Sequence, residues 1–199
     1  MAQGATLDVL GIAASLRRVS YSRMALRAAQ GLAPPGVTVG EYPTESLREI
    51  PPYDDDVRLA GFPPVVRDFR DRIRAADAVL IAMPEYNYSF PGVLKNAIDW
   101  ASRPPEQPFL DKPVALMSTT SGVLGGVRAQ YQLRQCFVFL DAKVLNRPEV
   151  FIGQAPQKFA ADGTLTDEPT AKIVAEMLAA LAAWTLRLRA GAAARSDAG

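Results

Sequence analysis

The strongest constraint on the fold is the run AVLIAM at residues 78–83, which contains no polar position. A strand with one solvent-facing side alternates in polarity, whereas a strand covered on both faces is apolar throughout. Helical patterns flank this run at residues 64–76 and 92–102. Because strands that alternate with helices form right-handed βαβ units, the chain predicts a parallel sheet with helices on both faces.

Five β-rich runs are expected to form this sheet, at residues 7–13, 37–42, 78–83, 113–118 and 143–152. Further helices are predicted over residues 22–32 and 125–141, and from Pro169, since proline is favoured in a first helical turn. This α/β pattern suits a flavodoxin-like three-layer sandwich with a five-stranded parallel sheet in the order 2-1-3-4-5. We expect one domain over residues 1–190 and a disordered tail over residues 191–199.

The composition excludes several kinds of chemistry. The 199 residues include no histidine and one cysteine, Cys136. A histidine-based triad, an imidazole metal site, an internal disulfide and a Cys-x-x-Cys site are therefore impossible, and we expect no metal. If the chain is an enzyme, its chemistry is expected to come from a bound organic cofactor.

Charge and hydropathy limit the classes of binding partner that can be expected. The net charge of +1 gives no reason to expect binding to nucleic acid or to an anionic membrane. No uncharged apolar run reaches the roughly 18 residues of a membrane-spanning helix, and the N-terminal segment lacks the features of a signal peptide. We therefore expect a cytoplasmic protein whose partner is a small molecule.

The first candidate loop is ASLRRVSYS, residues 14–22, which follows the first predicted strand. Ligands of such sheets bind beyond the carboxyl ends of the strands where the strand order reverses, here between strands 1 and 3. Hydroxyl groups, guanidinium groups and a helix N-terminus together favour a phosphate. An N-cap serine beside solvated arginines is the alternative. The polar side chains are those of Ser15, Arg17, Arg18, Ser20 and Ser22.

The second candidate loop, residues 84–91, follows strand 3. Pro84 and Pro91 are expected to stiffen it, so that backbone N–H groups hold fixed positions against a flat heteroaromatic ring. Ordinary half-buried aromatic residues and a structural carboxylate are the alternatives for its tyrosines and its glutamate. The residues concerned are Pro84, Glu85, Tyr86, Asn87 and Tyr88.

A third loop, STTSGVLGG at residues 118–126, follows strand 4. Its glycines permit close approach of backbone to a ligand, or simply form the turn that opens the next helix. The usual nucleotide fingerprints G-x-x-x-x-G-K-[ST] and G-x-G-x-x-G do not follow strand 1.

The segments SLRRVSYS, PEYNYSFPGVLKNAIDWASRP and STTSGVLGGVRAQYQLRQ strongly resemble the flavodoxin-like NADPH-dependent FMN reductases, from about residue 7 to residue 153. That family includes bacterial quinone, azo-dye and chromate reductases. The resemblance implies FMN as cofactor and NADPH or NADH as co-substrate. It also implies ping-pong transfer of electrons through FMN to quinones, azo compounds, free flavin or metal oxyanions such as chromate.

The resemblance also assigns residues. The FMN phosphate would lie against Ser15, Arg17 and Ser22; the ribityl chain and ring against Pro84, Glu85, Tyr86, Asn87 and Tyr88; and the pyrimidine side of the ring against Thr119, Thr120 and Gly122. Ser20 of the first loop is a further cofactor-binding candidate from the loop itself. No residue has a certain catalytic role, and Tyr88 is the candidate proton relay. Two positions where relatives often have glycine carry Ala14 and Val19 here, which matters if either needs a positive φ.

Two other functions fit the same fold. The first is a flavodoxin-type electron carrier without a substrate of its own, although such carriers are usually strongly acidic and this chain is not. The second is a nucleotide-binding or regulatory module without flavin. A homodimer or homotetramer is expected from the family and because residues 133–140 are apolar on two sides of one helix, with Val138 and Phe139 off the main face.

Overall fold

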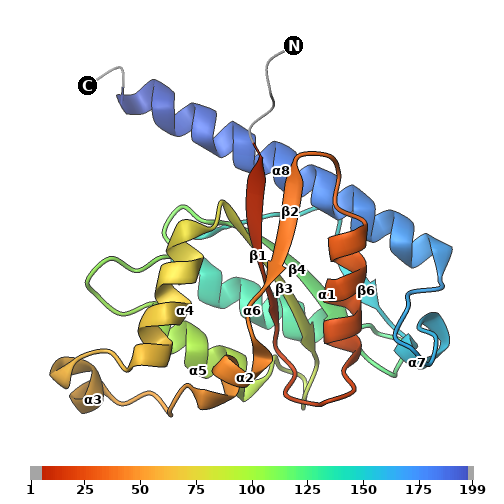
Figure 1. The fold of residues 1–199 in the computed structure, drawn as a ribbon, viewed down its shortest axis with the longest axis horizontal. Helices are drawn as coiled ribbons and strands as arrows, with labels where there is room; N and C mark the ends of the chain where they lie inside the picture. The colour runs from red at the N-terminus through yellow and green to blue at the C-terminus, as the bar shows by residue number, and fades with distance from the viewer. Residues whose placement is uncertain (1–5, 197–199) are drawn as a thin grey trace.

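The computed structural model describes residues 6–196 and contains a parallel sheet in the order β2-β1-β3-β4-β5, which confirms the predicted strand order (Figure 1). A sixth strand, β6, also pairs with β4. The strands are β1 (Leu7–Ala13), β2 (Val37–Glu41), β3 (Ala78–Pro84), β4 (Pro113–Thr119), β5 (Lys143–Val144) and β6 (Val150–Ile152).

The fifth strand differs from the prediction, which made residues 143–152 continuous. β5 pairs with the start of β4 and β6 with its end, and residues 145–149 leave the sheet between them. Pro148 lies in this break and has no N–H group to donate to a neighbouring strand. The apolar pattern of the segment predicted one strand, but the backbone forms two short ones.

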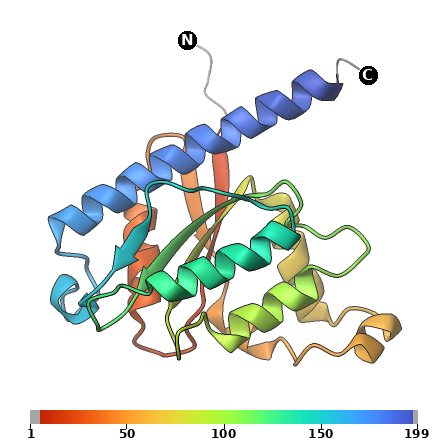
Figure 2. The same ribbon diagram turned by 180° about the vertical axis from the view of Figure 1, so that it is seen from behind.

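Helices cover both faces of the sheet (Figures 1 and 2). The five helices expected from periodicity all form, and each begins within two residues of its predicted start; the first four also end within two residues of their predicted ends. Three short helices of four to six residues were not expected. The first five are α1 (Tyr21–Gly31), α4 (Pro64–Ala75), α5 (Gly92–Ala101), α6 (Val127–Phe139) and α8 (Glu168–Ser196); the short ones are α2 (Thr44–Glu49), α3 (Asp55–Ala60) and α7 (Ala155–Lys158).

The last helix, α8, crosses one face of the sheet diagonally and projects past it at its C-terminal end (Figures 1 and 2). It continues through Gly191 to Ser196, where the sequence predicted a disordered tail. The remainder of that predicted tail, residues 197–199, lies outside the described residues.

Two apolar cores lie on opposite faces of the sheet. Ile81 packs in the core under α4, α5 and α6, whereas its neighbour Leu80 packs in the core under α1 and α8. Each is fully buried, because successive residues of a strand point to opposite faces and both faces are covered here. This confirms the interpretation of residues 78–83 as a strand buried on both sides.

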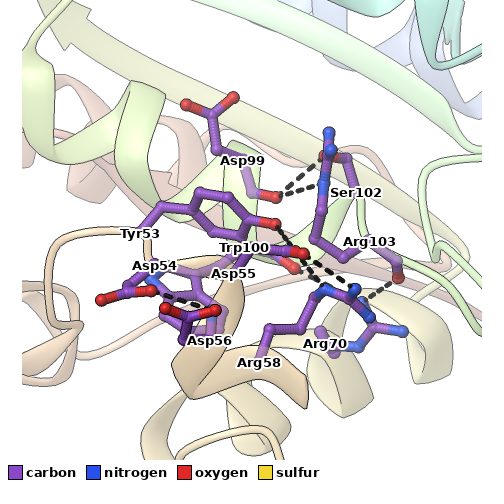
Figure 3. A network of polar contacts seen from close by, with 10 residues as sticks. All are labelled: Tyr53, Asp54, Asp55, Asp56, Arg58, Arg70, Asp99, Trp100, Ser102 and Arg103. Carbon is purple, nitrogen blue, oxygen red and sulfur yellow. Dashed lines mark hydrogen bonds and ion pairs between the residues drawn. The ribbon is translucent and has the colours of Figure 1, made fainter.

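A buried arginine organises the end of α5 (Figure 3). Arg70, only 4% exposed, donates hydrogen bonds at 2.7 Å to the carbonyl groups of Ala101 and Arg103. Its guanidinium also lies 4.2 Å from the centre of the Phe62 ring. The last carbonyl groups of a helix have no partner within the helix, and Arg70 of α4 supplies donors to those at the end of α5, whose C-cap residue is Ser102. The further acceptors are the carbonyl groups of Trp100, Pro105 and Glu106.

Candidate active site

The loops after β1, β3 and β4 meet at one edge of the sheet, at the bottom of Figure 1. Register sets this meeting, because Ala13 pairs with Ala82 and Pro84 pairs with Thr119, so the three strands end together. The loops surround a pocket of about 140 Å³. It is lined by Ser15, Arg17, Ser20, Tyr21, Ser22, Pro84, Glu85, Tyr86, Thr119, Thr120 and Ser121.

The pocket therefore brings together predicted residues from all three loops. It omits three of them, Asn87, Tyr88 and Gly122, and it adds Tyr21 and Ser121, which the sequence reasoning did not select. Both additions lie next to selected hydroxyl residues in the chain, so a search for every polar or aromatic residue in these loops would have included them.

Hydroxyl groups dominate the phosphate side of the pocket. Ser15, Ser20 and Ser22 are all buried, and Ser22 Oγ lies 2.9 Å from Thr119 Oγ1, which links the first and third loops. Ser20 is the N-cap of α1, and its hydroxyl accepts from the N–H of Arg23 at 3.3 Å. This confirms the N-cap alternative for one of the three serines, while the other two are free of that role.

The charge at this side of the pocket favours an anion. The first turn of α1 contains no acidic residue, so the partial positive charge of the helix N-terminus is not offset there. Arg17 lines the pocket, whereas Arg18 does not.

Ala14 and Val19 are not among the residues with positive φ, so the absence of glycine at these positions places no strain on the loop.

The loop after β3 folds into a tight turn. The N–H of Tyr86 donates to the Ser89 carbonyl at 2.8 Å, and the N–H of Ser89 donates to the Tyr86 carbonyl at 3.0 Å. Asn87 and Tyr88 between them have φ values of 49° and 68°, which is the left-handed pair of a type I′ turn. The Tyr86 N–H is thus used within the turn, and the expectation that it points at a ligand is wrong.

Glu85 is a structural carboxylate. Its side chain is 6% exposed and forms an ion pair with Arg128 of α6, and one of its oxygens accepts from the N–H of Ala129 at 3.4 Å. The Glu85 carboxylate raises the pKa of Arg128 through their hydrogen bond. Among the described residues that line the pocket, Glu85 is the one carboxylate, and because Arg128 of α6 balances its charge it does not repel an anion.

The same arginine supports Tyr88. The Arg128 guanidinium lies 3.7 Å from the centre of the Tyr88 ring, and that ring is otherwise exposed. Arg128 therefore contacts both ends of the turn segment, at Glu85 and at Tyr88. The sequence analysis did not select Arg128 for the site, because nothing in the spacing relates it to residues 40 and 43 positions earlier in the chain.

The glycines after β4 allow the backbone to make the turn before α6. Gly125 and Gly126 have φ values of 61° and 85°, and a Cβ on either would come within 2.7 Å of another atom, from Phe151 or Ser118. Gly122 has open space around its α-carbon, but its carbonyl accepts from Thr120 and from Gln154. The turn that opens α6 accounts for the pair, as the alternative interpretation held.

The family model that matches the chain is that of the NADPH-dependent FMN reductases, and it matches residues 7–157. The chain belongs to the NADPH-dependent FMN reductase family. It is accordingly an oxidoreductase, and the family to which it belongs combines FMN with NAD(P)H.

Individual relatives are similar to this chain over almost their whole length. An NAD(P)H-dependent FMN reductase of Pseudomonas aeruginosa is 52% identical over 183 residues, which are 92% of this chain and 97% of the relative. A quinone reductase of Escherichia coli K12 is 43% identical, with the same two coverages. The flavoenzyme NAD(P)H:acceptor oxidoreductase FerB of Paracoccus denitrificans superimposes with a TM-score of 0.82 at 35% identity, over 92% of this chain and 98% of FerB. The expected family and fold are therefore confirmed.

Proposed function

We propose that this reductase holds FMN noncovalently, with the phosphate in the hydroxyl pocket and the ring along the loops after β3 and β4. The observation that carries the proposal is the donor set of the pocket: buried hydroxyl groups, an α1 N-terminus without acidic residues and Arg17, around a carboxylate already paired with Arg128. Such a set suits a phosphate ester dianion.

The size of the pocket indicates that it would hold only part of the FMN molecule. Its volume of about 140 Å³ is below the roughly 300 Å³ at which pockets for whole organic ligands begin. The phosphate end fits within it, and the ring would lie beyond it. Tyr86, Val123 and Leu124 are exposed on the two flanking loops and supply apolar surface there. The binding residues proposed for the ring side are Pro84, Glu85, Tyr86, Asn87, Tyr88, Thr119, Thr120 and Gly122.

When bound, FMN supplies the hydride-accepting and electron-donating chemistry between NAD(P)H and an acceptor. The residues of the protein would bind and orient the cofactor. Ser15, Ser20, Ser22 and Arg17 would hold the phosphate, and the type I′ turn would fix the surface next to the ring. Tyr88, which is 65% exposed, is the candidate proton donor to the acceptor. The acceptors proposed are quinones, azo compounds, free flavin and metal oxyanions such as chromate.

The assembly proposed is a homodimer or homotetramer. Val138 and Phe139 at the end of α6 are 80% and 85% exposed, which is unusual for large apolar side chains that lie side by side. No helix within residues 6–196 is long and apolar enough to cross a membrane. We propose a cytoplasmic location for the enzyme.

Replacement of Arg17 by alanine is expected to weaken FMN binding about tenfold, because one charge-assisted hydrogen bond to the phosphate is lost. The measurement is fluorescence titration of the apoprotein with FMN. Arg18→Ala is the matched control, since Arg18 neighbours Arg17 but does not line the pocket. Equal affinities of the Arg17 variant and the parent protein would remove Arg17 from the site.

Initial rates at several fixed quinone concentrations are expected to give parallel double-reciprocal lines against NADPH. The reason is that donor and acceptor need the same exposed ring surface and so bind in turn. Intersecting lines would contradict the ping-pong scheme. A protein that binds FMN but does not oxidise NAD(P)H in this assay would be an electron carrier instead.

A further inference from the structure

A second pocket lies directly beside the hydroxyl pocket and shares two of its residues. It has a volume of about 290 Å³, and Arg17 and Tyr86 line both pockets. Its apolar lining comes from Ala14, Leu16, Pro91, Gly92 and Val93, and its second charged residue is Arg48 of α2. A ligand that extends past Tyr86 from the proposed flavin site would enter this pocket.

Its charge is wholly positive. The two charged residues that line it are arginines, and neither forms an ion pair with a carboxylate within residues 6–196. Glu45 of the same short helix pairs with Arg23, at 4.0 Å. Two guanidinium groups over an apolar floor form an arrangement that attracts an anionic group carried on a larger organic molecule.

Arg48 is also held in place. Its Nη2 donates to the carbonyl of Leu16 at 2.9 Å, within the loop that carries Arg17. This bond uses part of a guanidinium that has five N–H donors, so donors remain for a ligand. The same bond fixes the distance between α2 and the first loop, and it gives Arg48 a fixed place beside Arg17.

From these contacts we propose that Arg48, beside the Arg17 already proposed for the FMN phosphate, forms a subsite for a phosphate group of NAD(P)H. The inference rests on the proposed function, because hydride transfer requires the nicotinamide to lie against the flavin ring while the rest of the dinucleotide extends away from it. The dinucleotide carries two phosphate groups that could bind there: the diphosphate common to NADH and NADPH, and the 2′-phosphate found only in NADPH. An uncharged quinone has no group that needs this subsite.

The test is steady-state kinetics of FMN-loaded protein with NADPH or NADH as donor and an uncharged benzoquinone as acceptor. Arg48→Gln removes the charge and can still donate a hydrogen bond to Leu16. It is expected to raise KM for NADPH about 5- to 20-fold with kcat within about twofold, as for the loss of one charge-assisted contact. Arg48→Lys keeps the charge and is expected to recover part of the loss.

Two comparisons sharpen the result. An unchanged KM for NADH in the Arg48→Gln variant assigns the subsite to the 2′-phosphate, and a parallel rise assigns it to the diphosphate. Arg67→Gln is the control, since Arg67 is an exposed arginine of α4 that lines neither pocket. It is expected to leave both KM values within about twofold, as is usual for an exposed surface charge.

The proposal is overturned if Arg48→Gln leaves KM for both dinucleotides unchanged. It is also overturned if the variant loses FMN and its KM values recover once FMN is added in excess, since Arg48 would then only support the first loop. Failure of the proposed function has a different signature: the parent protein itself would not oxidise NAD(P)H.

Discussion

Replacement of Arg70 by methionine is expected to lower the free energy of unfolding by about 3–4 kcal/mol. Arg70 is held away from water, and this burial lowers the pKa of its guanidinium. The carbonyl groups around it offset that cost by accepting its hydrogen bonds. Methionine can still pack on Phe62, but it leaves carbonyl groups at the end of α5 without donors. Urea unfolding followed by circular dichroism measures the loss.

Arg72→Met is the control for this prediction. Arg72 lies on the same helix and pairs with Asp68 at 3.0 Å, but both side chains are close to half exposed. An exposed pair four residues apart on a helix contributes about 0.3–0.5 kcal/mol. Similar losses for the two variants would mean that the carbonyl network of Arg70 does not stabilise the fold as described.

Replacement of Arg128 by methionine is expected to raise the dissociation constant for FMN at least about tenfold, although Arg128 does not line the pocket. The variant leaves the Glu85 carboxylate buried without its partner, and it removes the cation from the face of Tyr88. The turn between these residues holds a tyrosine in the left-handed region, which costs about 1 kcal/mol or more and needs support from its surroundings.

A double-mutant cycle separates the ion pair from other effects of Arg128. Glu85→Gln alone leaves Arg128, whose side chain is 36% exposed and can be hydrated, so its effect on FMN affinity is expected to be smaller. The double variant is expected to bind FMN better than Arg128→Met alone, because the unpaired carboxylate is gone. Additive effects of the two changes would contradict the coupling.

The sequence predicted the fold well where pattern and burial coincide. Helices cover both faces of β3, and an uninterrupted apolar run such as residues 78–83 directly indicates such a strand. The break at Pro148 was missed, since the apolar residues on either side of it both pair with β4. Helix α2, which carries Arg48, is six residues long and therefore too short for its periodicity to be seen.

The site was predicted in part for a similar reason. The ends of adjacent parallel strands meet, so the serines after β1 and the threonines at the end of β4 could be brought together from topology alone. Contacts made by side chains from distant helices could not. Arg128 reaches Glu85 and Tyr88 from α6, and the two ends of these contacts have no periodic relation in the chain. The left-handed conformation of Tyr88 was equally hidden, because tyrosine is uncommon there.

The most direct test of the account is the visible spectrum of the purified protein, before and after addition of FMN and then of NADPH without oxygen. The account predicts a protein-bound flavin absorption band that disappears on addition of NADPH and returns when a quinone is supplied. A protein that gains no flavin band at saturating FMN would contradict the proposed binding site, and a bound band that NADPH leaves unchanged would contradict the proposed reaction.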